Sequence, residues 1–212
     1  MVGVWKLPRE GTVENPLRMA IFISGSGSGM EALLNHQNRG ENLHKTVIVI
    51  CDKANAGGIV KAQNLGAQVE VIEVPMHKDS QQRRIMHEER IQTVLDKYAA
   101  EAIVLSGYMR ILTASFVENW LGRMLNIHPS LLPKYPGAHA HRDALADGAT
   151  KSGCTIHFVD IGVDSGPIIT RGEVPILSGD NEQSLAARVK TIEHILYPQV
   201  LDEFAKGNIK FT

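Results

Sequence analysis

Apolar and polar positions along this chain follow two patterns that alternate repeatedly. Short, continuous apolar runs predict strands at residues 19–24, 46–51, 69–73, 102–106 and 124–128. Apolar residues at helical spacing predict a helix beginning near Met30 and two more at residues 56–65 and 80–100. Strands that alternate with helices are typical of a parallel sheet covered by helices on both faces. The predicted fold class is therefore α/β, with a mostly parallel, twisted sheet.

The pattern changes after residue 129. Pro133, Pro136 and Gly137 predict a long loop. Two further strands, at residues 155–160 and 168–173, flank a glycine-rich turn. We expect them to form a C-terminal antiparallel pair.

The last predicted helix begins where Asp180 and Gln183 resemble a capping box. Pro198 has no backbone N–H to donate, so we expect it to kink or interrupt this helix. The apolar face of the helix consists of Leu185, Val189, Ile192 and Leu196.

Composition limits the class of protein. The chain has 212 residues, of which 43% are hydrophobic and 21% charged, and a net charge of −1. This balance gives no electrostatic footprint for nucleic acid, and no apolar run approaches membrane-spanning length. We expect residues 1–18 to be an N-terminal extension, without the apolar core of a signal peptide, and residues 19–212 to be a single domain. Cys51 and Cys154 are expected to be buried thiols, which fits the cytoplasm.

The strongest candidate for catalysis is the pair Asn126 and His128, with Asp164 downstream. Side chains two apart in a strand share a face, and Pro129 favours an extended His128. An amide donor beside an imidazole suits a developing oxyanion. Asp164 is expected in a loop, from which its carboxylate orients the imidazole and favours its charged form. The three groups suggest acyl transfer without a protein nucleophile, although an Asn-x-His pair alone is more often the polar margin of a sheet.

The segment from Gly25 to Gly29 alternates glycine and serine between a predicted strand and a predicted helix. Glycines allow close backbone approach, and a helix N-terminus offers unpaired amides to an anion. We therefore predict a site for one phosphate, with a plain turn as the alternative. A dinucleotide site is less favoured, because Met30 stands where that fingerprint has its third glycine, although Asp52 is where a ribose-binding acid is expected.

Other histidines suggest different chemistry. His139 and His141 have metal-ligand spacing and, with His128, would make a hydrolase with a metal-activated water. This spacing constrains a site only loosely, so no metal is expected. His157 is expected on a strand. Four more are predicted to lie at the surface: His36, His44, His77 and His87.

Residues 19–204 resemble the folate-dependent formyltransferases, most closely those of purine biosynthesis. The segments that carry the resemblance are Ser-Gly-Ser-Gly-Ser at 24–28, Gly-Tyr-Met-Arg-Ile-Leu at 107–112, Asn-Ile-His-Pro-Ser-Leu-Leu-Pro-Lys-Tyr-Pro-Gly at 126–137, Asp-Ser-Gly-Pro-Ile-Ile at 164–169 and Glu-His-Ile-Leu-Tyr-Pro at 193–198. It implies a Rossmann-like formyltransferase fold. The implied reaction moves a formyl group from 10-formyltetrahydrofolate, the co-substrate, to the amine of glycinamide ribonucleotide.

The resemblance also implies roles for single residues. Asn126, His128 and Asp164 form the implied catalytic trio, with His128 protonated. Phosphate and ribose binding is implied for Gly27, Ser28, Gly29, Lys190 and Glu193. Folate binding is implied for Arg84, with Arg83 as the alternative, and for Met109, Arg110, Ile111 and Leu112. Gly29 departs from the family, which usually has Asn there, so a side-chain contact with the phosphate is expected to be lost.

Several alternatives remain open from the sequence. Without the family, Lys190 and Glu193 suggest an exposed charge pair and Arg110 a salt bridge. Formyltetrahydrofolate hydrolase would use the same trio with water in place of the amine, but typically carries an N-terminal regulatory domain. A nucleotide-binding module would need only the glycine-rich segment. The expected partners are small-molecule substrates, with no nucleic acid or membrane, and the chain is expected to be a monomer or homodimer.

Overall fold

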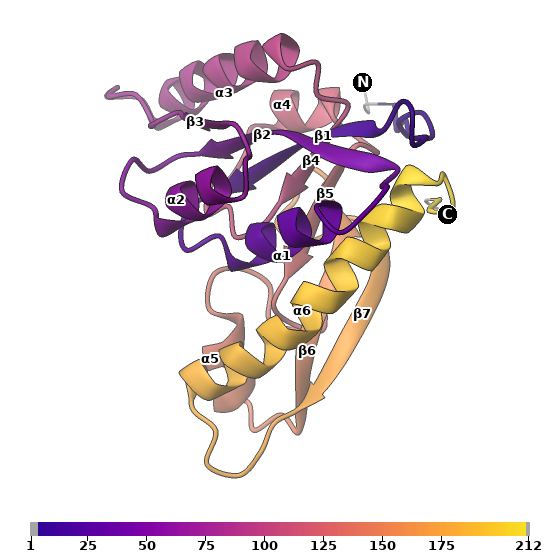
Figure 1. Cartoon of the computed structure of the whole chain (residues 1–212). Coiled ribbons are helices and arrows are strands. Elements are labelled where there is room, and N and C mark those ends of the chain that lie inside the picture. Colours follow the sequence, from indigo (N-terminus) through magenta and orange to yellow (C-terminus); the bar gives the residue numbers. More distant parts are fainter. Residues whose placement is uncertain (1–3, 211–212) are drawn as a thin grey trace.

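In the computed structural model, residues 4–210 form one seven-stranded sheet with the order β3-β2-β1-β4-β5-β6-β7 (Figure 1). Residues 1–3 and 211–212, the outermost parts of the predicted extension and domain, lie outside the described residues. Strands β1 to β5 are parallel, and β6 is antiparallel to both β5 and β7. The predicted fold class is confirmed. The strands are β1 (Leu17–Ile23), β2 (His44–Cys51), β3 (Val69–Val71), β4 (Ala102–Leu105), β5 (Met124–His128), β6 (Lys151–Phe158) and β7 (Ile168–Pro175).

Helices cover both faces of the sheet because alternate residues of its central strands are apolar on both sides. In β1, Met19 and Ile21 face the core that α1, α2 and α6 cover, whereas Ala20 and Phe22 face the core under α3 and α4. A smaller core joins α5 and the start of α6 to β6 and β7. The helices are α1 (Ser28–Gln37), α2 (Gly57–Asn64), α3 (Ser80–Lys97), α4 (Ala114–Asn119), α5 (Ala140–Ala146) and α6 (Glu182–Ala205).

Two predictions about α6 are corrected. Its N-cap is Asn181, which forms a capping box with Ser184, whereas Asp180 pairs with Arg188 at 2.6 Å. The helix also continues past Pro198 to Ala205 without interruption. Pro198 is itself buried in the helix, and the packing of the residues that follow it offsets the lost backbone hydrogen bond. Those buried residues are Val200, Leu201, Phe204 and Ala205.

Other differences concern short elements and boundaries. The predicted loop after residue 129 contains α5, and the sequence analysis did not predict α4. Both helices are short, so neither contains enough turns for a clear period. Helix α3 ends at Lys97 rather than residue 100, and β6 begins at Lys151 rather than residue 155.

The segment before β1 packs on the domain. Trp5 contacts Phe158 edge to face, with ring centroids 5.8 Å apart, and Gly11 N donates to Ala205 O at 2.8 Å. Arg9 Nε lies 2.7 Å from Glu101 Oε1. No helix among residues 4–210 is long and apolar enough to cross a membrane.

Several predictions about burial can be compared with the structure. The thiols of Cys51 and Cys154 are buried and free, as predicted. His77 is exposed and His36 half-buried. The prediction is wrong for His44 and His87, which are 1% and 4% exposed. His87 lies under β3, where its Nε2 is 2.7 Å from Ile72 O.

Candidate active site

A cavity of about 650 Å³ opens at the carboxyl ends of β1, β4 and β5. Strands β2 and β4 lie on opposite sides of β1, so the chain leaves β1 toward one side of the sheet and later returns to build the other side. Open α/β sheets bind ligands at such switch points. The cavity is lined by residues 25–29, 105–112, 126–129 and 159–164, and by parts of α5 and α6.

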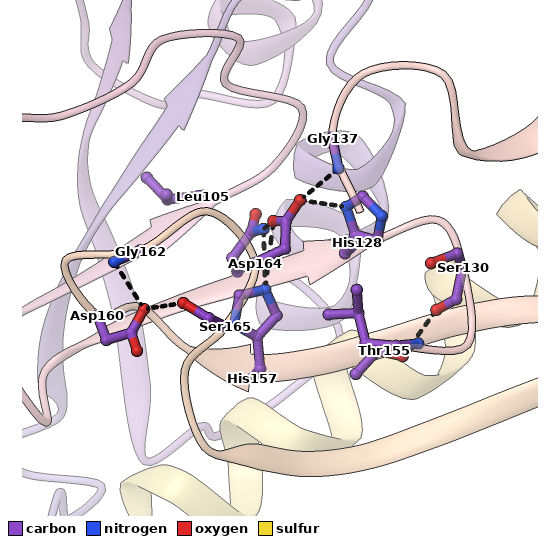
Figure 2. A network of polar contacts seen from close by, with 12 residues as sticks. Leu105, His128, Ser130, Gly137, Thr155, His157, Asp160, Gly162, Asp164 and Ser165 are labelled. Atoms are coloured by element: carbon purple, nitrogen blue, oxygen red, sulfur yellow. Dashed lines mark hydrogen bonds and ion pairs between the residues drawn. The ribbon is translucent and has the colours of Figure 1, made fainter. Parts of the chain in front are cut away.

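The three predicted catalytic side chains meet at one wall of this cavity. Asn126 and His128 lie on β5, and Asp164 comes from the loop between β6 and β7. Figure 2 shows the Asp164 carboxylate directed toward the His128 ring. His128 Nδ1 is 3.2 Å from Asp164 Oδ2, and Asn126 Nδ2 donates to Asp164 Oδ1 at 3.3 Å. The structure therefore brings together the groups that the sequence analysis joined, and their catalytic role stays a prediction.

Both ring nitrogens of His128 face hydrogen-bond acceptors. Nδ1 faces the Asp164 carboxylate, and Nε2 lies 2.9 Å from the backbone oxygen of Tyr135. Tyr135 and Asp164 have φ of 56° and 52°, values that non-glycine residues rarely adopt. Gly137 N donates to Asp164 Oδ2 at 2.8 Å and so holds the carboxylate in place. The strained backbone thus supplies an acceptor on each side of the ring.

The pKa values of the pair follow from burial and from these contacts. Burial lowers the pKa of His128, while the Tyr135 carbonyl and the charge of Asp164 oppose that change. Burial alone would raise the pKa of Asp164, but its contact with the His157 ring, the hydrogen bond from Gly137 N and the electrostatic influence of His128 lower it. The carboxylate is therefore ionised near neutral pH. The implied protonated His128 is not favoured at neutral pH in the ligand-free site, although the two acceptors accommodate the second proton.

His157 is a site residue that the sequence analysis did not connect with the trio. It lies on β6 directly opposite Asn126 and is 2% exposed. Its Nδ1 is 2.8 Å from Phe158 O, and its Nε2 is 3.2 Å from Asn126 Nδ2 and 3.7 Å from Asp164 Oδ1. Because a carbonyl only accepts, Nδ1 carries a proton, and in the neutral ring Nε2 accepts from the Asn126 amide. The strand register that makes this contact is not visible in the sequence.

The glycine-rich segment lies across the cavity from the trio. Gly27 is the N-cap of α1 with φ of 65°, and a Cβ there would come within 2.9 Å of the Gly58 Cα. No acceptor is found among residues 4–210 for the backbone N–H groups of Ser28, Gly29 and Met30. Three free amides at a helix N-terminus are suited to an anion, and the phosphate site stays a prediction.

Lys190 and Glu193 approach the same space from α6. Both line the cavity, and no ion pair joins them within the described part of the chain. Burial raises the pKa of Glu193 to about 7, although the charge of Lys190 opposes this. Lys190 is exposed and Glu193 half-buried, so the pair is partly exposed and its role in ligand binding stays a prediction.

Sequence and structure comparisons agree with this geometry. A sequence profile of the formyl transferase family, described as "Formyl transferase", matches residues 17–201. The chain belongs to the formyl transferase family. It is 38% identical to phosphoribosylglycinamide formyltransferase of Escherichia coli over 196 residues, which are 92% of this chain and 90% of that protein. It is also 40% identical to the human trifunctional purine biosynthetic protein adenosine-3 over 193 residues, but these cover only 19% of that longer protein.

Solved structures lead to the same family. The crystal structure of glycinamide ribonucleotide transformylase 1 from Symbiobacterium toebii superposes with a TM-score of 0.86 at 36% identity, covering 93% of this chain and 91% of that one. Phosphoribosylglycinamide formyltransferase from Brucella melitensis gives 0.83 at 42% identity, covering 93% and 100%. The predicted family and class of enzyme, a formyltransferase of purine biosynthesis, are confirmed. None of these relatives is named as a hydrolase.

Of the five residues implied to bind folate in this formyl transferase, four line the cavity and Arg84 does not. Residues 109–112 line the cavity, and Met109 and Ile111 are each 60% exposed. Arg110 Nε is 2.6 Å from Asp52 Oδ2, so both the salt-bridge alternative and a cavity position hold for Arg110. This contact also occupies the acid considered for a dinucleotide ribose. Arg84 is exposed on α3 and does not line the cavity.

The histidines suggested as metal ligands are separated. His141 lines the cavity, where burial lowers its pKa, whereas His139 precedes α5 and does not line it. Among residues 4–210, the one group of histidine and acidic side chains close enough to share an ion lies elsewhere. It consists of His36, His44 and Asp202.

Proposed function

We propose that this protein transfers the formyl group of 10-formyltetrahydrofolate to the amine of glycinamide ribonucleotide. The observation that carries the proposal is the meeting of Asn126, His128 and Asp164 at one cavity whose opposite wall is the anion site of α1. The similarity to enzymes named for this reaction supports the choice of substrates.

The reaction begins when the amine nitrogen attacks the formyl carbon. The carbonyl π electrons move to oxygen and leave a tetrahedral centre with an oxyanion, which needs hydrogen-bond donors. The Asn126 amide is one donor, since its contacts with Asp164 and His157, at 3.3 and 3.2 Å, are long and easily exchanged for a substrate oxygen. His128, once protonated, is the second donor.

The collapse of the tetrahedral centre requires a proton transfer. The attacking nitrogen loses one proton, and N10 of the folate leaves with the electrons of the C–N bond and gains one. We assign this exchange to Asp164 and His128, acting through water, because the ionised carboxylate lies beside a ring with an acceptor on each side. No protein nucleophile and no metal is needed in this scheme.

On the basis of the resemblance, we propose that different segments of the domain bind the two substrates. Gly27, Ser28 and Gly29 bind the phosphate, and Lys190 and Glu193 bind the ribose. Folate lies against the segment 109–112, with its tail toward Arg84. A monomeric or homodimeric state and a cytoplasmic location stay predictions.

One assay tests the proposal. The protein is mixed with 10-formyltetrahydrofolate, with and without glycinamide ribonucleotide, and formation of tetrahydrofolate is followed by absorbance. We expect loss of the formyl group only when the amine is present. Loss without the amine would mean a hydrolase, and no loss despite nucleotide binding would mean a binding module. Activity that is unchanged by a chelator is expected, because no step uses a metal.

A further inference from the structure

Ser106 places an unpartnered hydroxyl group at the anion site. The residue directly follows β4, lines the cavity and is 9% exposed. No hydrogen-bond partner is found for its Oγ within residues 4–210. The Oγ is not among the fully buried polar atoms without a partner, so it is reachable from the cavity. Beside the N-terminus of α1, it is free to donate to a ligand.

The hydroxyl occupies the space that a side chain at position 29 would need. A Cβ built on Gly29 would lie 2.5 Å from Ser106 Oγ, but 3.9 Å from Ser106 Cβ. The conflict is therefore with the hydroxyl alone. Glycine at 29 and serine at 106 thus fit each other.

We infer that Ser106 Oγ donates a hydrogen bond to the phosphate bound at α1, in place of a side chain at position 29. The identity of this phosphate, the 5′-phosphate of the ribonucleotide, rests on the proposed function. The free amides of Ser28, Gly29 and Met30 bind the anion from the helix side, and Ser106 binds it from the sheet side.

The first experiment compares two serine replacements in the full chain. Ser106→Ala is tested beside Ser152→Ala, which removes a hydroxyl that also has no partner in the described chain but is fully buried on β6, outside the cavity lining. Affinity for inorganic phosphate is measured by calorimetry, and kcat and KM are measured with glycinamide ribonucleotide. We expect Ser106→Ala to weaken phosphate binding and raise the ribonucleotide KM by about 3- to 10-fold, with kcat and the folate KM changed less than 2-fold. Ser152→Ala should leave the phosphate affinity, kcat and both KM values unchanged.

The second experiment tests the fit between positions 29 and 106. Gly29→Asn alone should weaken phosphate binding, because its Cβ meets the Ser106 hydroxyl. The double variant with Ser106→Ala should bind phosphate at least as tightly as Ser106→Ala alone, because the amide side chain then has room. Non-additivity of this kind is expected for residues in contact. Thermal melts of all variants separate loss of binding from loss of folding.

Two outcomes would overturn the inference. One is a Ser106→Ala variant whose phosphate affinity and ribonucleotide KM equal those of the parent. The other is a double variant in which the two losses simply add. Phosphate binding needs neither folate nor turnover, so a parent without transferase activity whose phosphate affinity still depends on Ser106 would refute the proposed function alone. An active parent that is indifferent to Ser106→Ala would refute this inference alone.

Discussion

Two histidine–aspartate clusters lie at opposite ends of the parallel strands, one at the start of β2 and the other at the end of β5. His128 ends β5 and contacts Asp164 at 3.2 Å, whereas His44 begins β2 and contacts Asp202 of α6 at 3.0 Å. Both rings are buried, and burial lowers both pKa values. A list of residue types would not distinguish them. The difference lies in what faces the second nitrogen of each ring.

His44 is held in one neutral tautomer. Gln37 Oε1 accepts from Thr46 N at 3.1 Å, which fixes the orientation of the amide and places its Nε2 donor 2.8 Å from His44 Nδ1. His44 Nδ1 must therefore accept, and the proton stays on Nε2 toward Asp202. A metal ligand needs the reverse arrangement, in which the second nitrogen donates to an acceptor. The cluster of His36, His44 and Asp202 is thus a structural contact between α1, β2 and α6.

His128 has the opposite surroundings, because both nitrogens face acceptors beside an open cavity. When His128 is protonated, each N–H therefore has an acceptor, and no donor–donor contact arises. The carboxylates differ too, since Asp202 lies inside a regular helix whereas Asp164 has φ of 52°. Strained backbone is typical of functional sites. The partner of the second nitrogen, and not the carboxylate, thus distinguishes His128, the proposed acid–base residue, from His44.

The largest expected effect is on turnover when the His128–Asp164 cluster is changed. Asp164→Asn removes the charge that assists proton transfer, so we expect kcat to fall by about 10²- to 10⁴-fold. Asp202→Asn is the matched replacement and should leave kcat within about 3-fold, since Asp202 lies outside the cavity lining. Steady-state kinetics of both variants checks this. Equal losses in the two variants would remove the distinction between the clusters.

Asn126→Ala tests the proposed oxyanion donor. Loss of one such donor typically costs about 10²- to 10³-fold in kcat, and we expect KM for both substrates to change far less. Thermal melts control for folding. Unchanged kcat with a raised KM would assign Asn126 to substrate binding and not to the transition state.

Removing the carboxylate of the His44–Asp202 cluster should affect stability instead. In Asp202→Ala the buried Nε2–H of His44 loses its acceptor, which costs about 1–3 kcal/mol of unfolding free energy. Denaturant unfolding measures this loss. Glu118→Ala, an exposed acid on α4, is the control and should change stability by less than about 0.5 kcal/mol. A variant as stable as the parent would show that the cluster contributes nothing to the fold.

Glu193 gives a smaller, pH-dependent effect. Its folded pKa of about 7 lies above the ordinary 4.5, so between these values the folded state holds a proton that the unfolded state has lost. The stabilisation is full below pH 4.5 and is lost as pH rises through 7. Glu193→Gln does not titrate, so its melting temperature relative to the parent should rise between pH 5 and pH 8, on the order of 3 °C. A constant difference across this range would contradict the raised pKa.

The sequence predicted the parts of the molecule that local patterns determine. The parallel strands β1, β2 and β4 contain continuous apolar runs, and the period of two in β5 placed Asn126 and His128 on one face. The environment of His44 was mispredicted because polar neighbours surround it in the sequence, while Asp202, 158 residues away, helps to bury it. His157 was missed for a similar reason, since only the antiparallel register brings it opposite Asn126. The two clusters differ in contacts between segments that are far apart in the sequence. Packing decides these contacts, and local sequence patterns do not reveal them.

The smallest expected effect is the sharpest test of the comparison. Gln37→Glu replaces the donor at His44 Nδ1 with an acceptor, while the other carboxylate oxygen still accepts from Thr46 N. The His44 ring then has acceptors on both sides, as His128 has, so its pKa should rise. Imidazole ¹⁵N shifts measured by NMR against pH follow the titration of His44. Gln37→Leu, which removes the donor without adding an acceptor, should raise the pKa less. If Gln37→Glu leaves the titration unchanged, burial alone governs His44, and the second nitrogen's partner does not explain why the two clusters differ.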